Sequence, residues 1–390
     1  MNYWKLRYDI KGKQECRRVS SNIKRLRKML ADTIPTQTTD KNLILGTWNI
    51  RNFDDNRFGH GPRLTESLFY LAEIINAFDV IAVQEVCDDI GPLKELMDIL
   101  GKDYDFIFTD VTEGRGGNKE RLGFIYNKRK VYFKGIAGEI VLPDKLLISA
   151  KNKLLQFSRT PFSVEFQSGW FKFNFATVHI YYGKSSKKSL EYKQRVNEIQ
   201  TIANFLAKRS NKESKKYGVN YVLVGDFNID ALGDKAYNAL EKAGFKIYQN
   251  RTGSNKNRTK FYDQISFKER PGEVMLSPSV NEKEQNGVFN AFKAVFRDED
   301  FSCYDKEVIK KLNENKNNLK NDLAETTSTT KRKSIQRKMA SLERLINNKD
   351  EREQYYLKDW RTFQISDHLP LWIDLQVDFT DKYLDRVFDE

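Results

Sequence analysis

Apolar runs of strand length that each end in a polar residue recur along the chain from residue 43 onward. The first two, LILGTWNI at 43–50 and VIAVQEV at 80–86, are separated by SLFYLAEIINAF, in which the apolar spacing is helical. Strands that are apolar for several successive residues are typical of a sheet covered on both faces. We therefore predict an α/β domain in which two β-sheets pack together and helices lie outside them. Further predicted strands are YDFIF, RLGFIYN, FSVEF, FKFNFATVHI, YVLVGDFNI, YDQISF and LPLWIDL, and helical patterns fall at about 190–209 and 235–243.

Residues 1–42 follow a different pattern and are predicted to form an element of their own. Apolar side chains alternate between Trp4 and Ile10, which predicts a short strand ending at Gly12. Ser20 or Ser21 is a candidate cap for a helix that follows. The apolar face of this predicted helix consists of Ile23, Leu26, Leu30 and Ile34.

This N-terminal segment is also basic, with 11 Lys/Arg against 4 Asp/Glu in a chain whose net charge is +13. Basic surfaces attract phosphate backbones, so the helix is a candidate nucleic-acid contact. It is equally a candidate for packing its apolar face on the rest of the protein, with its charges left in water. We favour packing as its structural role, because most helical stability comes from burying an apolar face. The two roles are compatible.

A second change of pattern predicts a helical hairpin inserted at about 305–350, before the last strand. Two stretches with helical apolar spacing are separated by the polar sequence ETTSTTKRK. The hairpin could mediate self-association, contact a protein partner or extend a substrate groove. Residues 301–360 hold 14 Lys/Arg and 10 Asp/Glu, a mixture that does not by itself define a nucleic-acid arm. The predicted organisation is therefore a basic element at 1–42 and a domain at 43–390 that contains this insert.

Composition excludes several classes of protein. The mean hydropathy is −0.67, and no apolar run approaches the roughly 20 residues that span a bilayer, so no membrane partner is expected. The N-terminus lacks the apolar segment of a secretory signal, which predicts a cytoplasmic location. The three cysteines, Cys16, Cys87 and Cys303, are far apart, and their spacing indicates neither a disulfide framework nor a zinc site.

Candidate chemistry lies where the predicted strands end. If the strands are neighbours in the sheets, their terminal carboxylates, amides and imidazoles converge at one edge. Oxygen ligands of this kind bind a hard cation, which neutralises phosphate charge and places the attacking water or the leaving group. Two of the chain's three histidines, His179 and His368, belong to these motifs, whereas His60 lies in a loop and is interpreted as a packing or surface residue. The motifs are WNIR (48–51), QEV (84–86), TVH (177–179), GDFN (225–228), YDQI (262–265) and SDH (366–368).

Together with KER (119–121), these motifs stand in an order that resembles the endonuclease/exonuclease/phosphatase superfamily, and within it most closely DNase I. The resemblance runs from about residue 43 to 376, interrupted by the predicted hairpin. It implies a DNase I-like four-layered sandwich, with two packed β-sheets flanked by helices. It says nothing about residues 1–42 or about the insert.

The resemblance implies a metal site and a water site. Glu85 matches the family's metal-binding glutamate, Asn49 the amide beside the metal, and Asp367 an aspartate at the metal end. Asp226 matches the aspartate that orients or deprotonates the attacking water, and Asn228 the amide that holds the phosphate or the metal. The implied cofactor is Mg²⁺, with Mn²⁺ as an alternative.

The resemblance also implies two histidine–carboxylate pairs. His368 matches the histidine that contacts the scissile phosphate or acts as a base, and Asp263 its carboxylate partner. His179 matches the second histidine, and Glu120 is its expected partner. A carboxylate on one ring nitrogen fixes the tautomer and raises the basicity of the other nitrogen. We expect both pairs to flank the scissile phosphate.

Two arginines resemble phosphate-clamping residues of the family, Arg51 in WNIR and Arg159 in FSRTP. A planar guanidinium suits a phosphate because it donates two parallel hydrogen bonds. The alternative for each is a structural ion pair. The chain departs from the DNase I branch at Cys87 and Asn118, where that branch has an arginine and a tyrosine that meet the DNA groove.

The sequence thus predicts a Mg²⁺-dependent phosphodiesterase, with a nuclease acting on DNA or RNA as the first hypothesis. A phosphatase or phosphodiesterase for a phosphoinositide or another small phosphoester is the second, since it would use the same centre. A non-catalytic nucleic-acid-binding protein is the third. It is disfavoured because competent residues fill the expected catalytic positions. Fold alone does not separate the three.

Overall fold

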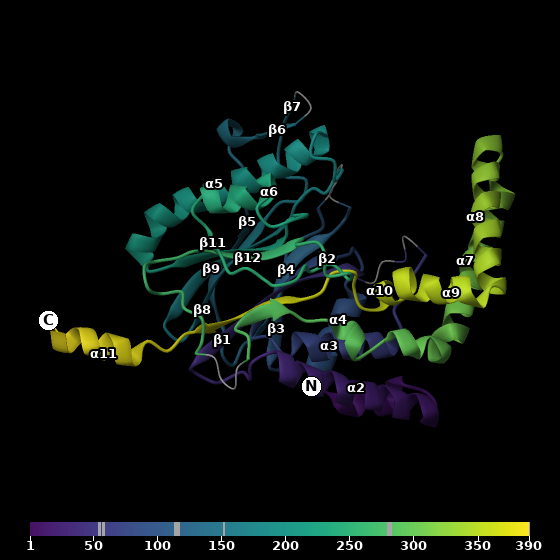
Figure 1. Ribbon diagram of the computed structural model, residues 1–390, viewed down its shortest axis with the longest axis horizontal. Coiled ribbons are helices and arrows are strands. Elements are labelled where there is room, and N and C mark those ends of the chain that lie inside the picture. Colours follow the sequence, from purple (N-terminus) through teal and green to yellow (C-terminus); the bar gives the residue numbers. More distant parts are fainter. Residues whose placement is uncertain (54–55, 57–58, 113–117, 151–152, 279–282, 390) are drawn as a thin grey trace.

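Two β-sheets pack face to face in the computed structural model, with helices on both outer faces (Figure 1). The structure describes residues 1–390 except 54–55, 57–58, 113–117, 151–152, 279–282 and 390. Within the described residues each of the two sheets has six strands. The first sheet has the order β13 (Asn286–Val288), β14 (Leu371–Gln376), β1 (Asn42–Phe53), β2 (Val80–Val86), β4 (Arg121–Asn127) and β3 (Tyr104–Phe108).

The second sheet is also mixed. In the first sheet β1 runs parallel to β2, and in the second β9 runs parallel to β10, while the other neighbours of these strands are antiparallel. A small separate hairpin is made by β6 (Ile148–Ala150) and β7 (Lys153–Leu155). The order of the second sheet is β11 (Lys246–Ile247), β12 (Asp263–Lys268), β10 (Asn220–Asp226), β9 (Phe171–His179), β8 (Phe162–Ser168) and β5 (Tyr132–Glu139).

The alternation of side chains along β1 explains the layers. Leu43 and Leu45 lie in the core between the two sheets, whereas Ile44 and Trp48 lie in the core under the helices. Both faces of the strand are therefore buried, and the predicted four-layered α/β sandwich is confirmed. None of the described helices is long and apolar enough to cross a membrane. The covering helices are α3 (Thr65–Ile75) and α4 (Gly91–Leu100) on the first sheet, and α5 (Leu190–Tyr217) and α6 (Lys235–Lys242) on the second; α11 (Thr380–Asp389) extends away from the body (Figure 1).

The predicted strand at 4–10 is wrong. Tyr3–Lys5 forms a 3-10 turn, and Leu6–Asp9 forms the short helix α1. Trp4 and Tyr8 are four residues apart, as on one helical turn, and their exposed rings meet edge to face at 5.9 Å. The alternating pattern does not mark a buried sheet face, because these two large side chains stay in water.

The basic helix α2 (Lys13–Thr33) packs its apolar face on the domain and begins earlier than the sequence predicts. Val19, Ile23 and Leu26 belong to the same core as α3 and the first sheet. A polar network reinforces the contact, because Arg18 Nη1 lies 2.8 Å from Glu66 Oε1 of α3 and also donates to the Tyr304 hydroxyl. The structure therefore confirms the favoured structural role of this helix, which is to pack its apolar face on the domain.

Two antiparallel helices occupy the region of the predicted hairpin, α7 (Phe301–Glu325) and α8 (Thr329–Asn347). Arg332 of α8 donates to the carbonyl oxygens of Leu323 and Thr326 at the end of α7, which fixes the turn between the helices. Figure 1 shows the hairpin rising at the right, away from both sheets. The chain returns to the first sheet through α9 (Lys349–Tyr355), a π-helical turn (Tyr356–Trp360) and α10 (Arg361–Gln364).

Removal of the distal part of the hairpin should leave the domain folded. The buried side chains of α7 end at Leu312, and α8 has none. We expect a variant in which residues 317–339 are replaced by a short Gly/Ser linker to unfold cooperatively, with a midpoint close to that of the parent. Thermal unfolding followed by circular dichroism measures this. Loss of the cooperative transition would show that the distal hairpin is integral to the fold.

Removal of one partner of a buried ion pair should strongly lower the free energy of unfolding. Lys130 Nζ lies 2.6 Å from Asp79 Oδ2, and both side chains are buried. Burial raises the pKa of Asp79, and Lys130 opposes that rise. Lys130→Met would leave the carboxylate alone in the core, which typically costs about 3–5 kcal/mol. Urea unfolding measures the loss.

The adjacent residue provides a matched control for this prediction. Arg129 pairs with Asp103 at 2.8 Å, but its side chain is mostly exposed. Arg129→Met should therefore cost no more than about 1 kcal/mol. Equal losses for the two variants would contradict the structural importance of the buried pair.

Candidate active site

Strand ends from both sheets meet at one edge of the sandwich. In the first sheet the parallel pair β1 and β2 carries Asn49 and Glu85 at neighbouring carboxyl ends. In the second sheet the parallel pair β9 and β10 sets His179 opposite Asp226. Because β12 is antiparallel to β10, its first residue, Asp263, also lies opposite Asp226. Topology alone therefore gathers side chains that are far apart in sequence.

Backbone conformation refines this placement. Gly225 has a φ of 126°, and a Cβ there would lie 2.1 Å from the Val178 carbonyl oxygen of β9. The GDFN motif therefore needs glycine, because β9 and β10 approach closely just before Asp226. Glu85 and Asn228 have φ values of 61° and 54°, a left-handed conformation that costs free energy in residues with side chains. Strain of this kind is typical of functional sites.

His368 and Asp263 form a buried hydrogen-bonded pair. His368 Nδ1 lies 2.8 Å from Asp263 Oδ2, and the ring of Tyr262 lies over the imidazole with centroids 5.4 Å apart. Burial alone would lower the pKa of His368, but the carboxylates of Asp263 and Asp226 raise it well above its ordinary value. The other ring nitrogen, Nε2, is 3.7 Å from Asp226 Oδ2.

His179 occupies the matching position in the second pair. Its Nδ1 lies 3.0 Å from Glu120 Oε2, although the ring is not aligned for a hydrogen bond. Its Nε2 lies 3.5 Å from Asp226 Oδ2. The two histidines thus present their Nε2 atoms to the same oxygen, while their Nδ1 atoms face separate carboxylates.

Arg159 lies behind this second pair rather than in an open cleft. Its Nε donates to Glu120 Oε2 at 2.6 Å, and its Nη2 to Glu120 Oε1 at 3.3 Å. Burial by itself would raise the pKa of Glu120, but His179 and Arg159 lower it to about 2. A buried carboxylate requires such a partner. Arg159 is expected from the sequence to clamp a substrate phosphate or to form a structural ion pair. The structure shows the ion pair, with Glu120.

Asn49 links the two sheets at the centre of the site. Its Nδ2 donates to Glu85 Oε1 at 2.8 Å and to Asp226 Oδ2 at 3.1 Å. Its buried Oδ1 has no hydrogen-bond partner among the described residues. Glu85 Oε2 in turn accepts from the backbone N–H of Asn52 at 2.8 Å. An unpartnered amide oxygen beside a carboxylate is a donor set that suits a hard cation.

Asn228 is held in place by hydrogen bonds to the backbone. Its N–H donates to Asp226 Oδ1 at 2.8 Å, and its side-chain Nδ2 to the Ile180 carbonyl at 2.8 Å. Arg195 of α5 donates to the Asn228 carbonyl oxygen at 2.7 Å and pairs with Asp230 at 3.1 Å. The sequence reading missed Arg195, since nothing in a helix of mixed charge distinguishes this buried arginine.

Asp367 and Arg51 lie beside the site and face each other. Arg51 Nε is 3.7 Å from Asp367 Oδ1, and the guanidinium stacks 3.7 Å from the centroid of the Phe363 ring. Within the described chain no hydrogen bond or ion pair joins Asp367 to Glu85 or Asn49. The structure therefore brings Glu85 and Asn49 together and sets Asp367 beside Arg51, so the place of Asp367 at the metal end stays a prediction.

Lys256 is a second residue that the sequence reading missed. Its backbone N–H donates to the Asp367 carbonyl at 2.7 Å, and its side chain reaches the Lys358 carbonyl. Burial lowers the pKa of Lys256, while Asp359 and Asp367 oppose that shift. The loop that carries Lys256 belongs to no motif, but its short bridge to His368 brings it to the site.

His60 has a packing role, as the sequence suggests. Its ring stacks on Phe363 with centroids 3.7 Å apart, and its Nδ1 lies 3.2 Å from the Tyr355 hydroxyl. Burial, together with the charges of Arg51 and Lys311, lowers the pKa of His60 to about 4. The ring is therefore neutral at physiological pH and does not face Asp226.

Comparison with known proteins finds similar solved structures but no similar sequence. No protein-family model and no curated protein matches the sequence. Among solved structures, an endonuclease/exonuclease/phosphatase family protein from Bacteroides thetaiotaomicron is similar, with 16% identity, a TM-score of 0.49 and coverage of 86% of this chain and 98% of that chain.

Two further structures carry functional names. A mannosyl-6-phosphatase from Bacteroides thetaiotaomicron has 20% identity and a TM-score of 0.45, over 64% of this chain and 90% of its own. The human Nocturnin catalytic domain has 13% identity and a TM-score of 0.42, over 62% of this chain and 88% of its own. At such identities the likeness concerns the fold alone, so function is argued from the site.

Proposed function

We propose that this protein is a metal-dependent phosphodiesterase that hydrolyses the backbone of a nucleic acid. The observation that carries the proposal is the convergence of two imidazoles on one carboxylate. His179 Nε2 and His368 Nε2 lie 3.5 and 3.7 Å from Asp226 Oδ2. Each imidazole has its own buried carboxylate on the opposite nitrogen.

The site residues fit a divalent cation. Glu85 and Asn49 are the residues that would hold it, because the Asn49 Oδ1 has no hydrogen-bond partner among the described residues and lies in the same cluster as the Glu85 carboxylate. When bound, Mg²⁺ or Mn²⁺ supplies charge neutralisation for the phosphate. The two groups of described residues that could hold a metal consist of carboxylates and histidines, a donor set that suits a hard rather than a soft metal.

The chain's own residues supply the proton chemistry. Asp226 orients the attacking water, since its Oδ2 is the point on which both imidazoles and Asn49 converge. One imidazole accepts the proton of this water at Nε2, and the other donates a proton from Nε2 to the leaving oxygen. Asp263 and Glu120 face the Nδ1 atoms of the two rings, and Asp263 stabilises the cationic form of His368. Arg159 acts as a positioning residue, because it fixes Glu120 in its ionised state.

A phosphoester of a small molecule or a phosphoinositide remains the alternative substrate, since it would use the same centre. The net charge of +13 favours a polyanion over a monoester, because electrostatic attraction grows with the number of phosphates.

A substrate panel tests the proposal. Supercoiled and linear DNA, single-stranded DNA, RNA and phosphoinositides are incubated with the protein in Mg²⁺ or Mn²⁺, and products are separated by electrophoresis or chromatography. We expect cleavage of at least one nucleic acid. Turnover of phosphoinositides alone would favour the alternative over the nuclease proposal. Turnover of none of these substrates would contradict both proposals.

A further inference from the structure

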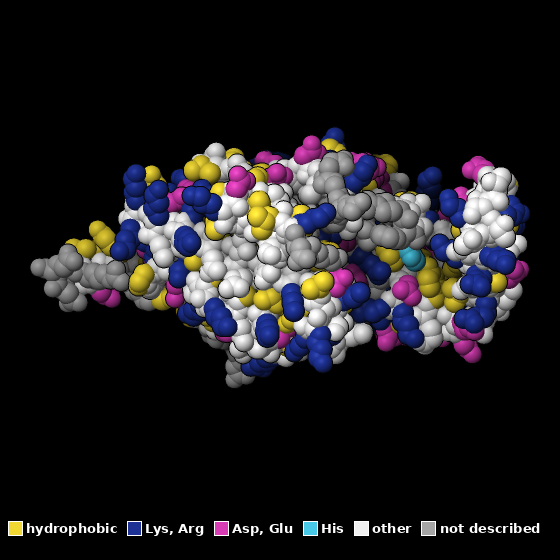
Figure 2. Space-filling view, turned by 90° about the horizontal axis from the view of Figure 1, so that it is seen from above, with side chains coloured by type: hydrophobic (Ala, Val, Ile, Leu, Met, Phe, Trp, Pro, Cys, Tyr) yellow, Lys and Arg dark blue, Asp and Glu magenta, His cyan; other side chains and the backbone are white. Residues whose placement is uncertain are grey.

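The two helices of the projecting hairpin differ in charge. Helix α7 contains five Lys/Arg and five Asp/Glu, whereas α8 contains six Lys/Arg and one Asp/Glu. A count over the whole segment hides this separation. The structure assigns the excess positive charge to one helix, and Figure 2 shows Lys and Arg side chains around the hairpin at the right of the view.

Four cations of α8 have no counter-charge within the described part of the chain. They lie within eight residues, and all are exposed. Two of the five Lys/Arg of α7 are paired, since Lys316 lies 3.0 Å from Glu343 of α8 and Lys311 lies 3.5 Å from Glu314, and α7 balances its cations with five Asp/Glu of its own. The four unpaired residues, which we call the α8 cations, are Lys331, Lys333, Arg337 and Lys338.

Among the described residues, helix α8 packs along α7 and not on the sheets. None of its side chains is buried, and only residues near its end, such as Leu342 and Leu345, pack partly against the domain core. The part that carries the α8 cations stands apart from the sheets (Figure 1). A helix that buries none of its side chains and carries an excess of one charge is suited to a polyanionic partner.

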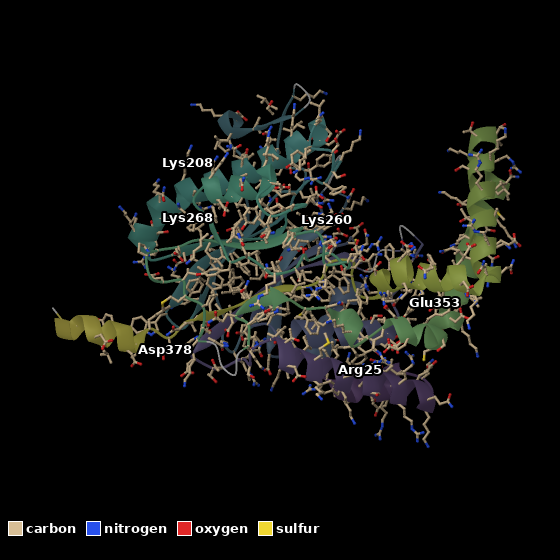
Figure 3. The ribbon with its side chains drawn as sticks, viewed as in Figure 1. Arg25, Lys208, Lys260, Lys268, Glu353 and Asp378 are labelled. Atoms are coloured by element: carbon tan, nitrogen blue, oxygen red, sulfur yellow. The ribbon has the colours of Figure 1, made fainter. Side chains whose placement is uncertain are left out.

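The hairpin is joined to the active-site edge through its base. After α8, the chain passes through α9 and α10 before it reaches His368. Tyr355 of α9 contacts His60, and Phe363 of α10 stacks on Arg51, which lies beside the site. Figure 3 shows Glu353 at this base, below α8. The base of the hairpin therefore lies beside the site, and a substrate that extends past this base would meet α8.

We propose that the α8 cations bind the backbone phosphates of the polynucleotide substrate, away from the bond that is cleaved. This inference rests on the proposed nuclease function and extends it to a substrate longer than the active site. The 19 residues of α8 span about 28 Å at the helical rise of 1.5 Å per residue, comparable to roughly eight base pairs of duplex. At 3.6 residues per turn, Lys331 and Lys338 lie on one side of the helix and Lys333 and Arg337 on the other, so the α8 cations present positive charge on two faces of the rod.

Two variants with the same change of charge test the proposal. The first replaces the α8 cations by glutamine: Lys331→Gln, Lys333→Gln, Arg337→Gln and Lys338→Gln. The matched control replaces four exposed cations of α2, a basic helix on another side of the protein (Figure 3, where Arg25 marks it). Glutamine has a helix propensity close to that of lysine, so both helices should persist. The control changes are Lys13→Gln, Arg17→Gln, Lys24→Gln and Lys28→Gln.

The readout is binding of labelled duplex DNA of about 30 base pairs in EDTA, measured between about 50 and 200 mM salt. Each cation that meets a phosphate contributes about 0.9 to the slope of log K against log salt. The α8 variant should lose two or more units of slope and bind at least tenfold more weakly at low salt, and the α2 control should lose less than one unit. The difference should vanish for duplexes too short to reach α8. Hydrolysis of bis(p-nitrophenyl) phosphate should be unchanged in the α8 variant, because these side chains do not touch the site.

Each outcome decides the question. If the α8 variant keeps the affinity and salt slope of the parent, or if both variants lose equally, the arm does not bind the substrate, and an acidic protein surface becomes its candidate partner. The same conclusion holds if the parent binds neither duplex DNA nor single-stranded DNA nor RNA. If the parent binds duplex through α8 but cleaves no nucleic acid in Mg²⁺ or Mn²⁺, the nuclease proposal fails while the binding surface stands.

Discussion

His368→Ala should slow phosphodiester hydrolysis by about 10²–10⁴-fold, the usual contribution of a side chain that transfers a proton in the transition state. Asp263 holds Nδ1 of this ring at 2.8 Å, so Nε2 is directed to the position where Asp226 orients the water. His179→Ala should lose a similar factor, because its Nε2 faces the same oxygen. Initial rates at saturating substrate measure both effects.

Two further variants separate chemistry from folding. Asp263→Asn should lose less activity than His368→Ala, because the imidazole remains although its orientation and charge are less well supported. His60→Phe should retain most of the activity, since it preserves stacking on Phe363 and lies outside the convergence on Asp226. A folded His368→Ala variant that cleaves at the parental rate would refute the proposed mechanism.

The strand-end motifs could be predicted to converge on the condition that their strands are neighbours in the sheets. This reasoning needed only the runs before Asn49, Glu85 and Asp226, and the structure places all three within one hydrogen-bonded cluster. The pairing of His368 with Asp263 followed from motif order together with the resemblance, and the observed distance of 2.8 Å agrees with it.

Other features left no readable pattern in the sequence. Strand β5 (Tyr132–Glu139) is exposed along its whole length, so no alternation of buried and exposed residues marks it. Helix α4 starts at Gly91-Pro92, which resembles a turn signal, although proline is well tolerated in a first helical turn. At the N-terminus, alternation between Trp4 and Ile10 suggested a strand, whereas the structure forms helical turns there.

Side-chain partners within the site were harder to predict than the site itself. Arg159 and Arg51 carry the same charge in similar motifs, yet one is buried against Glu120 and the other lies half-buried beside Asp367. The partner of each arginine depends on which carboxylate is buried and needs a counter-charge. Burial of a carboxylate is a property of the tertiary structure and leaves no pattern in the sequence. Lys256 depends in the same way on a bridge between its loop and His368.

Chelation of divalent cations should abolish activity, because a phosphodiester cleaved at this site requires neutralisation of its charge. Glu85→Gln removes a carboxylate charge from the expected ligand set while it retains the shape of the side chain. Loss of groups that only support a metal ligand costs about 10–100-fold in metal affinity or activity, so this variant should need at least that much more Mg²⁺ for half-maximal rate. Titration of the rate with Mg²⁺ measures the shift.

Asp88→Asn is the matched control for Glu85→Gln. Asp88 lies three residues further along the chain, is exposed, and belongs to neither of the acidic clusters at the site. Its replacement should leave the Mg²⁺ dependence of the rate unchanged. Equal shifts for the two variants would indicate a general effect of negative charge rather than a ligand.

The central claim, metal-dependent hydrolysis of a phosphodiester backbone at this site, is tested most directly by one measurement on the parent protein. Cleavage of a nucleic acid is followed in a single preparation in Mg²⁺, after excess EDTA, and after Mg²⁺ or Mn²⁺ is restored beyond the chelator. We predict cleavage, then its complete loss, then its recovery, for at least one polynucleotide. Full activity in excess EDTA, or no cleavage of any nucleic acid in either metal, would contradict the account.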